Sequence, residues 1–320
     1  MLQTSRFQLA IRLIPAYALH ATLHPYRRDL DEPQAALRID RIRARNSAAA
    51  LDAWVQLLIG AYSNRVGAQA RRESGRLAIR YIRLMAAMNR EFEYRLATGQ
   101  SVQLASVLSQ PLVAECAMDW RRFTAQHSRN PAIIDFLEQR DLIDDYASYV
   151  AVTTRDEFGS SADLQLESMR LDSGGYLARL VRLIGEFSEL PTTPDVLREF
   201  RTLGLAAKLA DDFADLATDS AEGRYNLLLT LLAAEPAEHA AVTAALANSE
   251  RLRPRWWQSN APRSFGTFSA MYERHYAEIE SRSLQVICDL TMLHAARGPR
   301  PRQNSRPGQH VTEPPCESWR

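Results

Sequence analysis

The sequence predicts an all-α protein. Glycine provides only 13 of the 320 residues, below the usage of about 7% that is average for proteins. Apolar residues make up 46% of the chain, and over most of its length they recur with the 3.6-residue period of amphipathic helices. No stretch alternates apolar and polar residues between turn dipeptides, so the sequence does not require strands. The apolar content is high enough to build a substantial core.

Several helical stretches are expected, and prolines or glycines separate most of them. Proline lacks an amide hydrogen and cannot continue a preceding helix, so helices should begin or end at such residues. Thr192 or Thr193 precedes Pro194, and a threonine side chain at that place can cap the first turn of a helix. The breaks fall at Pro25, Gly99, Pro111, Pro131, Pro191, Pro194, Pro236 and Pro254. The expected helices span 33–66, 72–97, 101–126, 131–153, 161–189, 193–219, 223–234, 236–249 and 265–294.

Residues 31–296 are expected to form one helical domain. Residues 1–30 are left without an assignment, because their apolar stretch is interrupted by Pro15 and lacks the core of a signal peptide. Residues 297–320 are rich in proline and arginine and poor in aliphatic side chains, so this tail is expected to be disordered. No apolar run approaches the ~20 residues that a membrane-spanning helix requires.

Charge and cysteine content exclude several classes of function. The net charge is +1 and the arginines are interleaved with acids, so no surface for nucleic acid is expected. Cys116, Cys288 and Cys316 lack metal-binding spacing, and an odd number of cysteines suits a reducing cytoplasm better than a set of disulfides. A cytoplasmic protein is therefore expected. No Ser/His/Asp or Cys/His set has a spacing that points to a catalytic nucleophile.

Three aspartates in the helix expected over 193–219 share one face. Asp211, Asp215 and Asp219 are spaced i, i+4 and i+8, which stacks them one turn apart. Their carboxylates repel one another, so the arrangement costs stability unless a cation binds there. Oxygen ligands of this kind suit Mg²⁺, which binds a few carboxylates and completes its shell with water and substrate phosphates. The alternative is an ordinary solvated acidic face.

The residues around these aspartates resemble the second metal motif of class I terpene synthases. That motif reads Asn/Asp-Asp-Leu-x-Ser/Thr-x-x-x-Glu and is often followed by Gly and Asn-Leu. The chain has Asp-Asp-Phe-Ala-Asp over 211–215, then Asp219, Gly223 and Asn226-Leu227. The resemblance implies a single-domain isoprenoid synthase fold, a helical bundle around a central cavity. It also implies that Asp211, Asp215 and Asp219 bind Mg²⁺, with three ions present when substrate is bound.

A second element of that family has a counterpart upstream. Gly174 and Gly175 interrupt the helix expected over 161–189 and should break or unwind it. The family carries a diphosphate-sensing arginine, a linker three residues on and a small effector residue next, and Arg170, Ser173 and Gly174 fit that spacing. Without the resemblance, the pattern would be a helix end with a surface arginine. Further candidates for binding the substrate diphosphate are Lys208, Arg224 and Arg282.

The Asp-Asp-x-x-Asp string that the family carries as its first metal motif is missing from the expected region. Asn89 and Glu93 are four residues apart on one helix face and are the best-placed substitutes, although they could also be ordinary surface residues. A second candidate, Asp141 with Asp144 and Asp145, is better explained as acids at a helix start.

The resemblance implies Mg²⁺-dependent ionisation of a prenyl diphosphate, favouring a C20 substrate that could be a bicyclic copalyl-type diphosphate, and cyclisation of the carbocation to a diterpene. Aromatic faces stabilise such a cation. Two alternatives stay open: a squalene- or phytoene-synthase-like enzyme, which the stretch 144–152 faintly resembles, and a helical binding protein without catalysis. Whether the chain forms a homodimer is also open. The candidate cavity aromatics are Phe92, Tyr146, Tyr149, Phe187 and Phe213.

Overall fold

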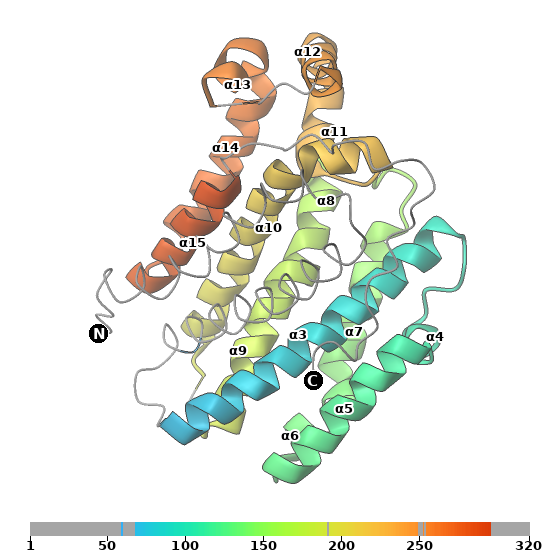
Figure 1. Ribbon diagram of the computed structural model, residues 1–320, viewed down its shortest axis with the longest axis vertical. Helices are drawn as coiled ribbons and strands as arrows, with labels where there is room; N and C mark the ends of the chain where they lie inside the picture. Colours follow the sequence, from blue (N-terminus) through green and yellow to red (C-terminus); the bar gives the residue numbers. More distant parts are fainter. Residues whose placement is uncertain (1–58, 60–67, 191, 249–251, 253, 296–320) are drawn as a thin grey trace, which may run out of the picture. The chain divides into compact units, whose positions relative to one another are not determined.

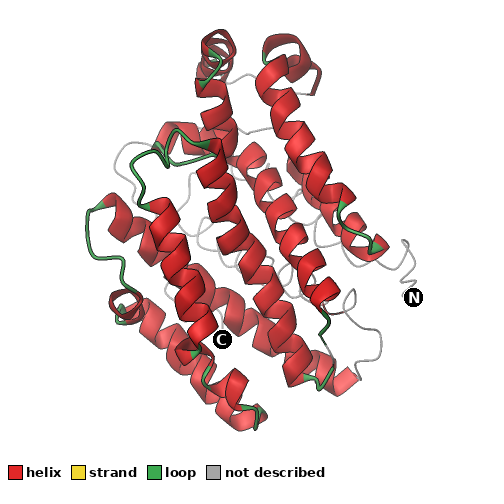
Figure 2. Cartoon of the chain, turned by 180° about the vertical axis from the view of Figure 1, so that it is seen from behind, coloured by secondary structure: helices red, strands yellow, loops and turns green. Residues whose placement is uncertain are grey.

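The computed structural model describes residues 59, 68–190, 192–248, 252 and 254–295 (Figure 1). Within these residues every regular element is a helix, which confirms the all-α prediction (Figure 2). Apart from residue 59, the expected helix 33–66 lies outside the described part, as do the segment 1–30, the domain limits at residues 31 and 296, and the tail 297–320 that the sequence predicts to be disordered. The elements are α3 (Ala68–Ala97), α4 (Leu104–Leu108), α5 (Pro111–His127), α6 (Pro131–Ile134), η2 (Phe136–Glu138), α7 (Arg140–Thr153), α8 (Ala162–Met169), η3 (Arg170–Gly174), α9 (Gly175–Phe187), α10 (Pro194–Glu222), α11 (Leu227–Ala233), α12 (Pro236–Ala247), α13 (Pro254–Asn260), α14 (Pro262–Ala277) and α15 (Arg282–Ala295).

The chain divides into two compact units within α3, between Ile79 and Arg80. Of the first unit, the structure describes Ile59 and the first turns of α3. All later described residues belong to the second unit.

Several expected helices are shorter than the periodicity alone predicts. The stretch 101–126 is divided into α4 and α5, because Gln110 has an extended backbone with ψ of 140°. A residue before proline is disfavoured in the helical region, and Pro111 follows. The stretch 131–153 forms α6, a 3₁₀ turn and α7, and the stretch 265–294 is divided between α14 and α15.

Helix α10 organises the second unit. It packs against α9 and η3 on one side and against α14 and α15 on another (Figure 1). Its start agrees with the sequence prediction, since the Thr193 side chain accepts a hydrogen bond from the amide of Val196 at 3.3 Å. Its end is set by Gly223, which has a φ of 65° that favours glycine. The expected helix 223–234 therefore begins only at Leu227, after a cap at Asn226.

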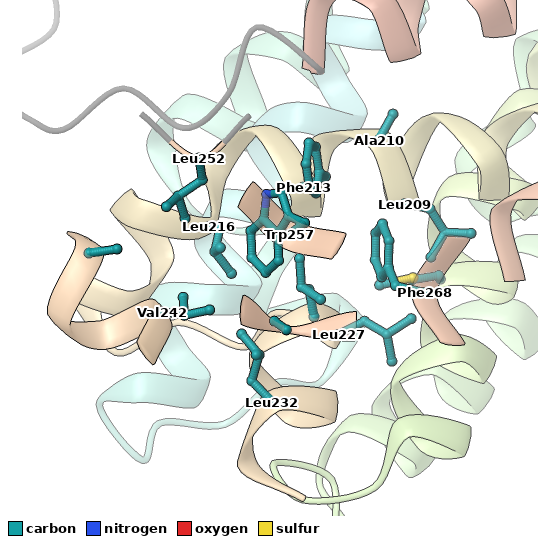
Figure 3. Packing of buried hydrophobic residues seen from close by; sticks show 14 of the residues in the cluster. Leu209, Ala210, Phe213, Leu216, Leu227, Leu232, Val242, Leu252, Trp257 and Phe268 are labelled. Atoms are coloured by element: carbon teal, nitrogen blue, oxygen red, sulfur yellow. The ribbon is translucent and has the colours of Figure 1, made fainter. Parts of the chain in front are cut away.

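A buried apolar cluster joins α10 to the helices that follow it. Leu209, Phe213 and Leu216 project from α10 into this cluster (Figure 3). They meet leucines of α11, Trp257 of α13 and Phe268 of α14, and the ring centroids of Phe213 and Trp257 are 5.7 Å apart. This packing buries the apolar side of α10, so the acidic side of the helix faces away from the cluster.

None of the described helices combines the length and apolar character needed to cross a bilayer.

Candidate functional site

One face of α10 carries the candidate site. Gly204, Lys208, Asp211, Asp215 and Asp219 follow one another at spacings of three or four residues, so they lie along a single stripe of the helix. The stripe begins where η3 packs against α10 and ends where the chain turns into α11. Its polar residues have different exposures and partners, and these differences determine what each can do.

The end of the stripe is a buried hydrogen-bonded corner. Asn226 donates from Nδ2 to the Asp219 carboxylate at 2.8 Å and to the Asp212 carbonyl at 2.7 Å, while its Oδ1 accepts from the first amides of α11. The amide of Leu227 donates to Asp212 Oδ2 at 2.8 Å. Asp212 and Asp219 are buried, with 1% and 8% of their surfaces exposed. These two acids therefore hold the α10–α11 junction together.

The middle of the stripe is crowded with acids and more open. Asp211 and Asp215 are both exposed. Burial raises the pKa of Asp215 above its ordinary value, and the neighbouring carboxylates of Asp211 and Asp219 raise it further. The three aspartates therefore act on one another, as their spacing predicts. A cation at this place would relieve the repulsion.

Lys208 forms ion pairs beside these acids. Its Nζ lies 3.1 Å from Asp211 Oδ2 and 3.1 Å from Asp212 Oδ1. Burial disfavours the charged ammonium, but the carboxylates of Asp212 and Asp211 outweigh this effect and raise the pKa of Lys208. The lysine side chain is 35% exposed, so it is not locked inside the protein.

Segment η3 shows that the glycine pair does not interrupt the helix. Arg170–Gly174 forms a π-helical turn between α8 and α9, so the expected break is a widening of one continuous helical path. This turn packs directly on the backbone of α10. A Cβ atom at Gly204 would lie 2.1 Å from the Ser173 carbonyl oxygen, and one at Gly174 would lie 3.0 Å from the Arg201 carbonyl oxygen.

Asp172 in the π turn lies within electrostatic reach of Lys208 on the stripe. Burial raises the pKa of Asp172, the positive charge of Lys208 opposes that rise, and the Glu93 carboxylate adds to it. Ser173 Oγ lies 3.4 Å from Asp172 Oδ2. Burial, followed by the charges of Asp172 and Glu93, also raises the pKa of Tyr149 on α7. The charges of Glu93 on α3, Asp172 in η3 and Lys208 on α10 therefore act within one region, which also includes Tyr149 of α7.

Of the two predicted first-motif residues, Glu93 is near enough for its charge to act on Asp172 and Tyr149. Asn89 Nδ2 donates to Glu93 Oε1 at 3.1 Å, so the two share a face of α3 as their spacing predicts. In contrast, the acids at the start of α7 pair with arginines. Asp141 contacts Arg182, Asp144 contacts Arg140, and Asp145 contacts Arg179.

The predicted diphosphate-binding arginines are spread around the unit. Arg170 is half exposed, pairs with Glu167 at 3.3 Å, and its charge acts on His275 of α14. Arg224 pairs with Glu222 at 2.7 Å beyond the end of α10. Arg282 is exposed and bonds Gln285 at 3.0 Å. Lys208 is the predicted diphosphate ligand that directly contacts the aspartate stripe.

The five candidate aromatics fall into three groups. Phe92 lies 4.9 Å from Tyr149 and 6.1 Å from Tyr146, measured between ring centroids, and this group adjoins Asp172 through Tyr149. Phe187 stacks on Phe123 of α5. Phe213 points to the opposite side of α10 from Asp211 and Asp215, because residues two apart on a helix face nearly opposite directions.

Phe213 lines a cavity of about 310 Å³ between α10, α14 and α15. The other lining residues are Phe265, Phe268, Ser269, Tyr272, Glu273 and Met292. The Tyr272 hydroxyl donates to the Cys288 carbonyl at 3.1 Å. This cavity lies behind the acidic stripe rather than beside it.

The stripe has ligand chemistry that fits Mg²⁺. Asp211 and Asp215 offer exposed carboxylates, and the buried Asp212 Oδ1 accepts no well-formed hydrogen bond and faces the Lys208 ammonium. Within the described residues, no three His, Cys, Asp or Glu side chains are already arranged to hold a metal ion. Binding would therefore require these side chains to turn toward the ion.

Sequence reasoning missed Asp172, and it named Lys208 as a diphosphate ligand without noticing what sets this residue apart. Asp172 stands between Arg170 and Ser173, yet its role depends on the direction in which the π turn points it. Composition alone singles out Lys208, because it is the only lysine among the 39 lysine and arginine residues of the chain. Comparisons with known protein families, with characterised proteins and with solved structures found no match to this chain.

Proposed function

We propose that this chain is a class I terpene synthase, which ionises a prenyl diphosphate with Mg²⁺ and cyclises the resulting carbocation. A C20 substrate, either linear or of the bicyclic copalyl type, is the favoured choice. One observation carries the proposal. The packing of Ser173 on Gly204 seats the π turn one helical turn before Lys208, whose charge acts on Asp172, at the start of the stripe that bears Asp211, Asp215 and Asp219.

The residues of the stripe have separable tasks in this proposal. Asp211 and Asp215 are exposed and would hold Mg²⁺ together with an oxygen of Asp219, whose position Asn226 sets. When bound, the metal would offset the negative charge that develops on the leaving diphosphate. Lys208 would add a positive charge from α10. Arg170 is half exposed, pairs with Glu167, and lies where its charge acts on His275 of α14, so it would have to leave this position to reach the same phosphates.

The group of Phe92, Tyr146 and Tyr149 would stabilise the cation. Phe92 is almost fully buried, and Tyr149 lies within the electrostatic reach of Asp172 and Glu93. Ring faces attract a positive charge without capturing it, whereas a carboxylate could form a bond with it. No nucleophile is needed to begin such a reaction, since the first step is the breaking of the bond between carbon and the diphosphate oxygen.

The experiment incubates the purified protein with geranylgeranyl, farnesyl or copalyl diphosphate and Mg²⁺. Release of diphosphate and formation of volatile products are measured. The test variants are Asp211→Asn and Asp215→Asn, because these exposed residues do not belong to the buried corner. Each should reduce diphosphate release by about a hundredfold or more. The matched control is Asp195→Asn, an exposed aspartate in the first turn of the same helix.

The outcomes separate the alternatives. Intact substrate under every condition would overturn the proposal and favour a helical binding protein. Consumption of two prenyl diphosphates with formation of a C30 or C40 hydrocarbon would favour a squalene- or phytoene-synthase-like enzyme. Equal loss in Asp195→Asn and Asp215→Asn would show that the stripe has no special role.

A further inference from the structure

The chain has a single lysine, and it lies inside the candidate site. Every other position with a permanent positive side-chain charge carries arginine, which makes 38 arginines and one lysine among the 39 basic residues. Lys208 Nζ contacts Asp211 and Asp212 at 3.1 Å each. Its charge also acts on Asp172 and Asp215. The ammonium of Lys208 thus interacts electrostatically with four carboxylates, three on α10 and one in η3.

The two amino acids differ in ways that matter here. Arginine holds carboxylates with a rigid planar fork, and such paired contacts are strong and specific in direction. Lysine presents a compact charge on a flexible stem and can rotate between partners. Lys208 lies one turn after Gly204, so its stem starts beside the π turn and reaches along the helix to the acids. A rotation of this stem would move the ammonium away from Asp211 without moving the backbone.

We infer that Lys208 is a resident cation of the acidic stripe, which a divalent metal ion displaces and which then binds the substrate diphosphate. The inference rests on the proposed function, because it assigns the metal to Asp211 and Asp215. Without metal, the ammonium neutralises part of the repulsion among the acids. An ion of charge +2 competes for the same oxygens and repels the ammonium. The freed ammonium would then lie on the side of the stripe nearest to the π turn, where Ser173 packs against Gly204.

This exchange predicts opposite effects on two ligands. Removing the ammonium in Lys208→Met should strengthen binding of Mn²⁺, used as a probe for Mg²⁺, by about tenfold, because a like charge beside the ion is lost. The same variant should bind inorganic pyrophosphate more weakly in the presence of Mn²⁺. Lys208→Arg should bind Mn²⁺ no more tightly than the natural protein, because the planar guanidinium group of the new arginine would remain paired with the same carboxylates. Free Mn²⁺ measured by electron paramagnetic resonance gives the first affinity, and calorimetry gives the second.

The matched control is Arg198→Met. Arg198 Nη1 pairs with Asp195 at 2.7 Å, so this variant removes one positive charge from the same helix at the same spacing of three residues from an acid. It should leave both affinities within about twofold of the natural protein, because solvent and salt screen a charge at that distance. Circular dichroism shows whether each variant folds.

The single lysine allows a second readout in the unmutated protein. Reductive methylation with ¹³C-formaldehyde labels Lys208 and the terminal amine and keeps their positive charges. Adding Mg²⁺ should shift the Lys208 resonance as the ammonium leaves its carboxylates, and adding pyrophosphate should then shift it again. The terminal amine serves as the internal reference.

The failures can be told apart. If the natural protein binds Mn²⁺ and Lys208→Met binds it equally well or more weakly, the exchange is refuted while the metal site stands. A Lys208 resonance that does not shift when Mg²⁺ is added would also refute the exchange. If neither protein binds Mn²⁺, both the proposed function and the exchange are overturned.

Discussion

The backbone of Gly204 on α10 meets the carbonyl of Ser173 so closely that a Cβ atom at residue 204 would lie 2.1 Å from that oxygen. The clash would be with backbone atoms, so rotation of a side chain cannot relieve it. This contact sets how η3 lies on α10. It thereby sets where the π turn, which carries Asp172, lies along the stripe.

Gly204→Ala should therefore destabilise the protein by at least about 2 kcal/mol, because the π turn or α10 must shift to admit the methyl group. Urea unfolding measures the change. Gly266→Ala is the matched control, since it also lies within a helix and nothing lies within 4 Å of its added Cβ. That variant should gain up to about 1 kcal/mol from the better helix propensity of alanine. A loss in Gly266→Ala equal to that in Gly204→Ala would contradict the role of the contact.

Asn226→Ala should destabilise the protein by about 3 kcal/mol. The change removes the cap of α11 and leaves the buried Asp219 carboxylate and the Asp212 carbonyl without their donor. Asn260→Ala is the control, because the exposed Asn260 makes one hydrogen bond at its own helix end, to the Trp256 carbonyl at 2.9 Å. It should cost less than about 1 kcal/mol. Thermal and urea unfolding of both variants measure whether the hydrogen bonds of this corner contribute that much to the free energy of unfolding.

Asp215→Asn should raise the stability of the metal-free protein, although by less than about 1 kcal/mol because the residue is exposed. The change relieves repulsion from Asp211 and Asp219. Melting temperatures with and without Mg²⁺ test this. The ion should raise the melting temperature of the natural protein and have little effect on the variant. A variant that melts at a lower temperature without Mg²⁺ would show that the acids do not oppose one another.

Glu238 gives a pH-dependent prediction away from the site. Its carboxylate accepts hydrogen bonds from the amides of Arg263 and Ser264, both at 2.9 Å, and so caps the start of α14. Burial alone would raise the pKa of Glu238, but the amides of Ser264 and Arg263 outweigh it and lower the pKa. A depressed folded-state pKa adds stability above the unfolded value, near 4.3, and that stability is lost as the pH falls through the folded pKa.

Glu238→Gln should therefore cost about 1–2 kcal/mol at pH 7, and the difference from the natural protein should shrink as the pH falls below about 4. Urea unfolding at several pH values measures it. Glu235→Gln is the comparison. The Glu235 carboxylate contacts the exposed side chain of Arg263, at 3.2 Å, rather than the backbone amides that Glu238 binds. Its cost should stay below about 1 kcal/mol. A difference for Glu238→Gln that does not depend on pH would contradict the charged cap.

Local features of the chain could be predicted because their causes are local. Helical periodicity predicts α3, α10 and α12, and a threonine before a proline predicts the start of α10. Spacing predicts that the three aspartates share a face and that Asn89 meets Glu93. The glycine pair predicts an irregular turn in the right place. Its form, a π turn rather than a break, depends on the packing of that turn against Gly204.

By itself, the sequence determined the all-helical character, the shared acidic face and the position of the irregular turn, because each depends on residues within a few turns of one another. Only the tertiary structure decided that Asp212 and Asp219 are buried in a corner with Asn226, while Asp211 and Asp215 are exposed. It alone brought Asp172 within electrostatic reach of Lys208 and separated Phe213 from the ring group on α3 and α7. Burial and long-range contacts depend on how helices distant in sequence pack together, and periodicity carries no information about which helices become neighbours.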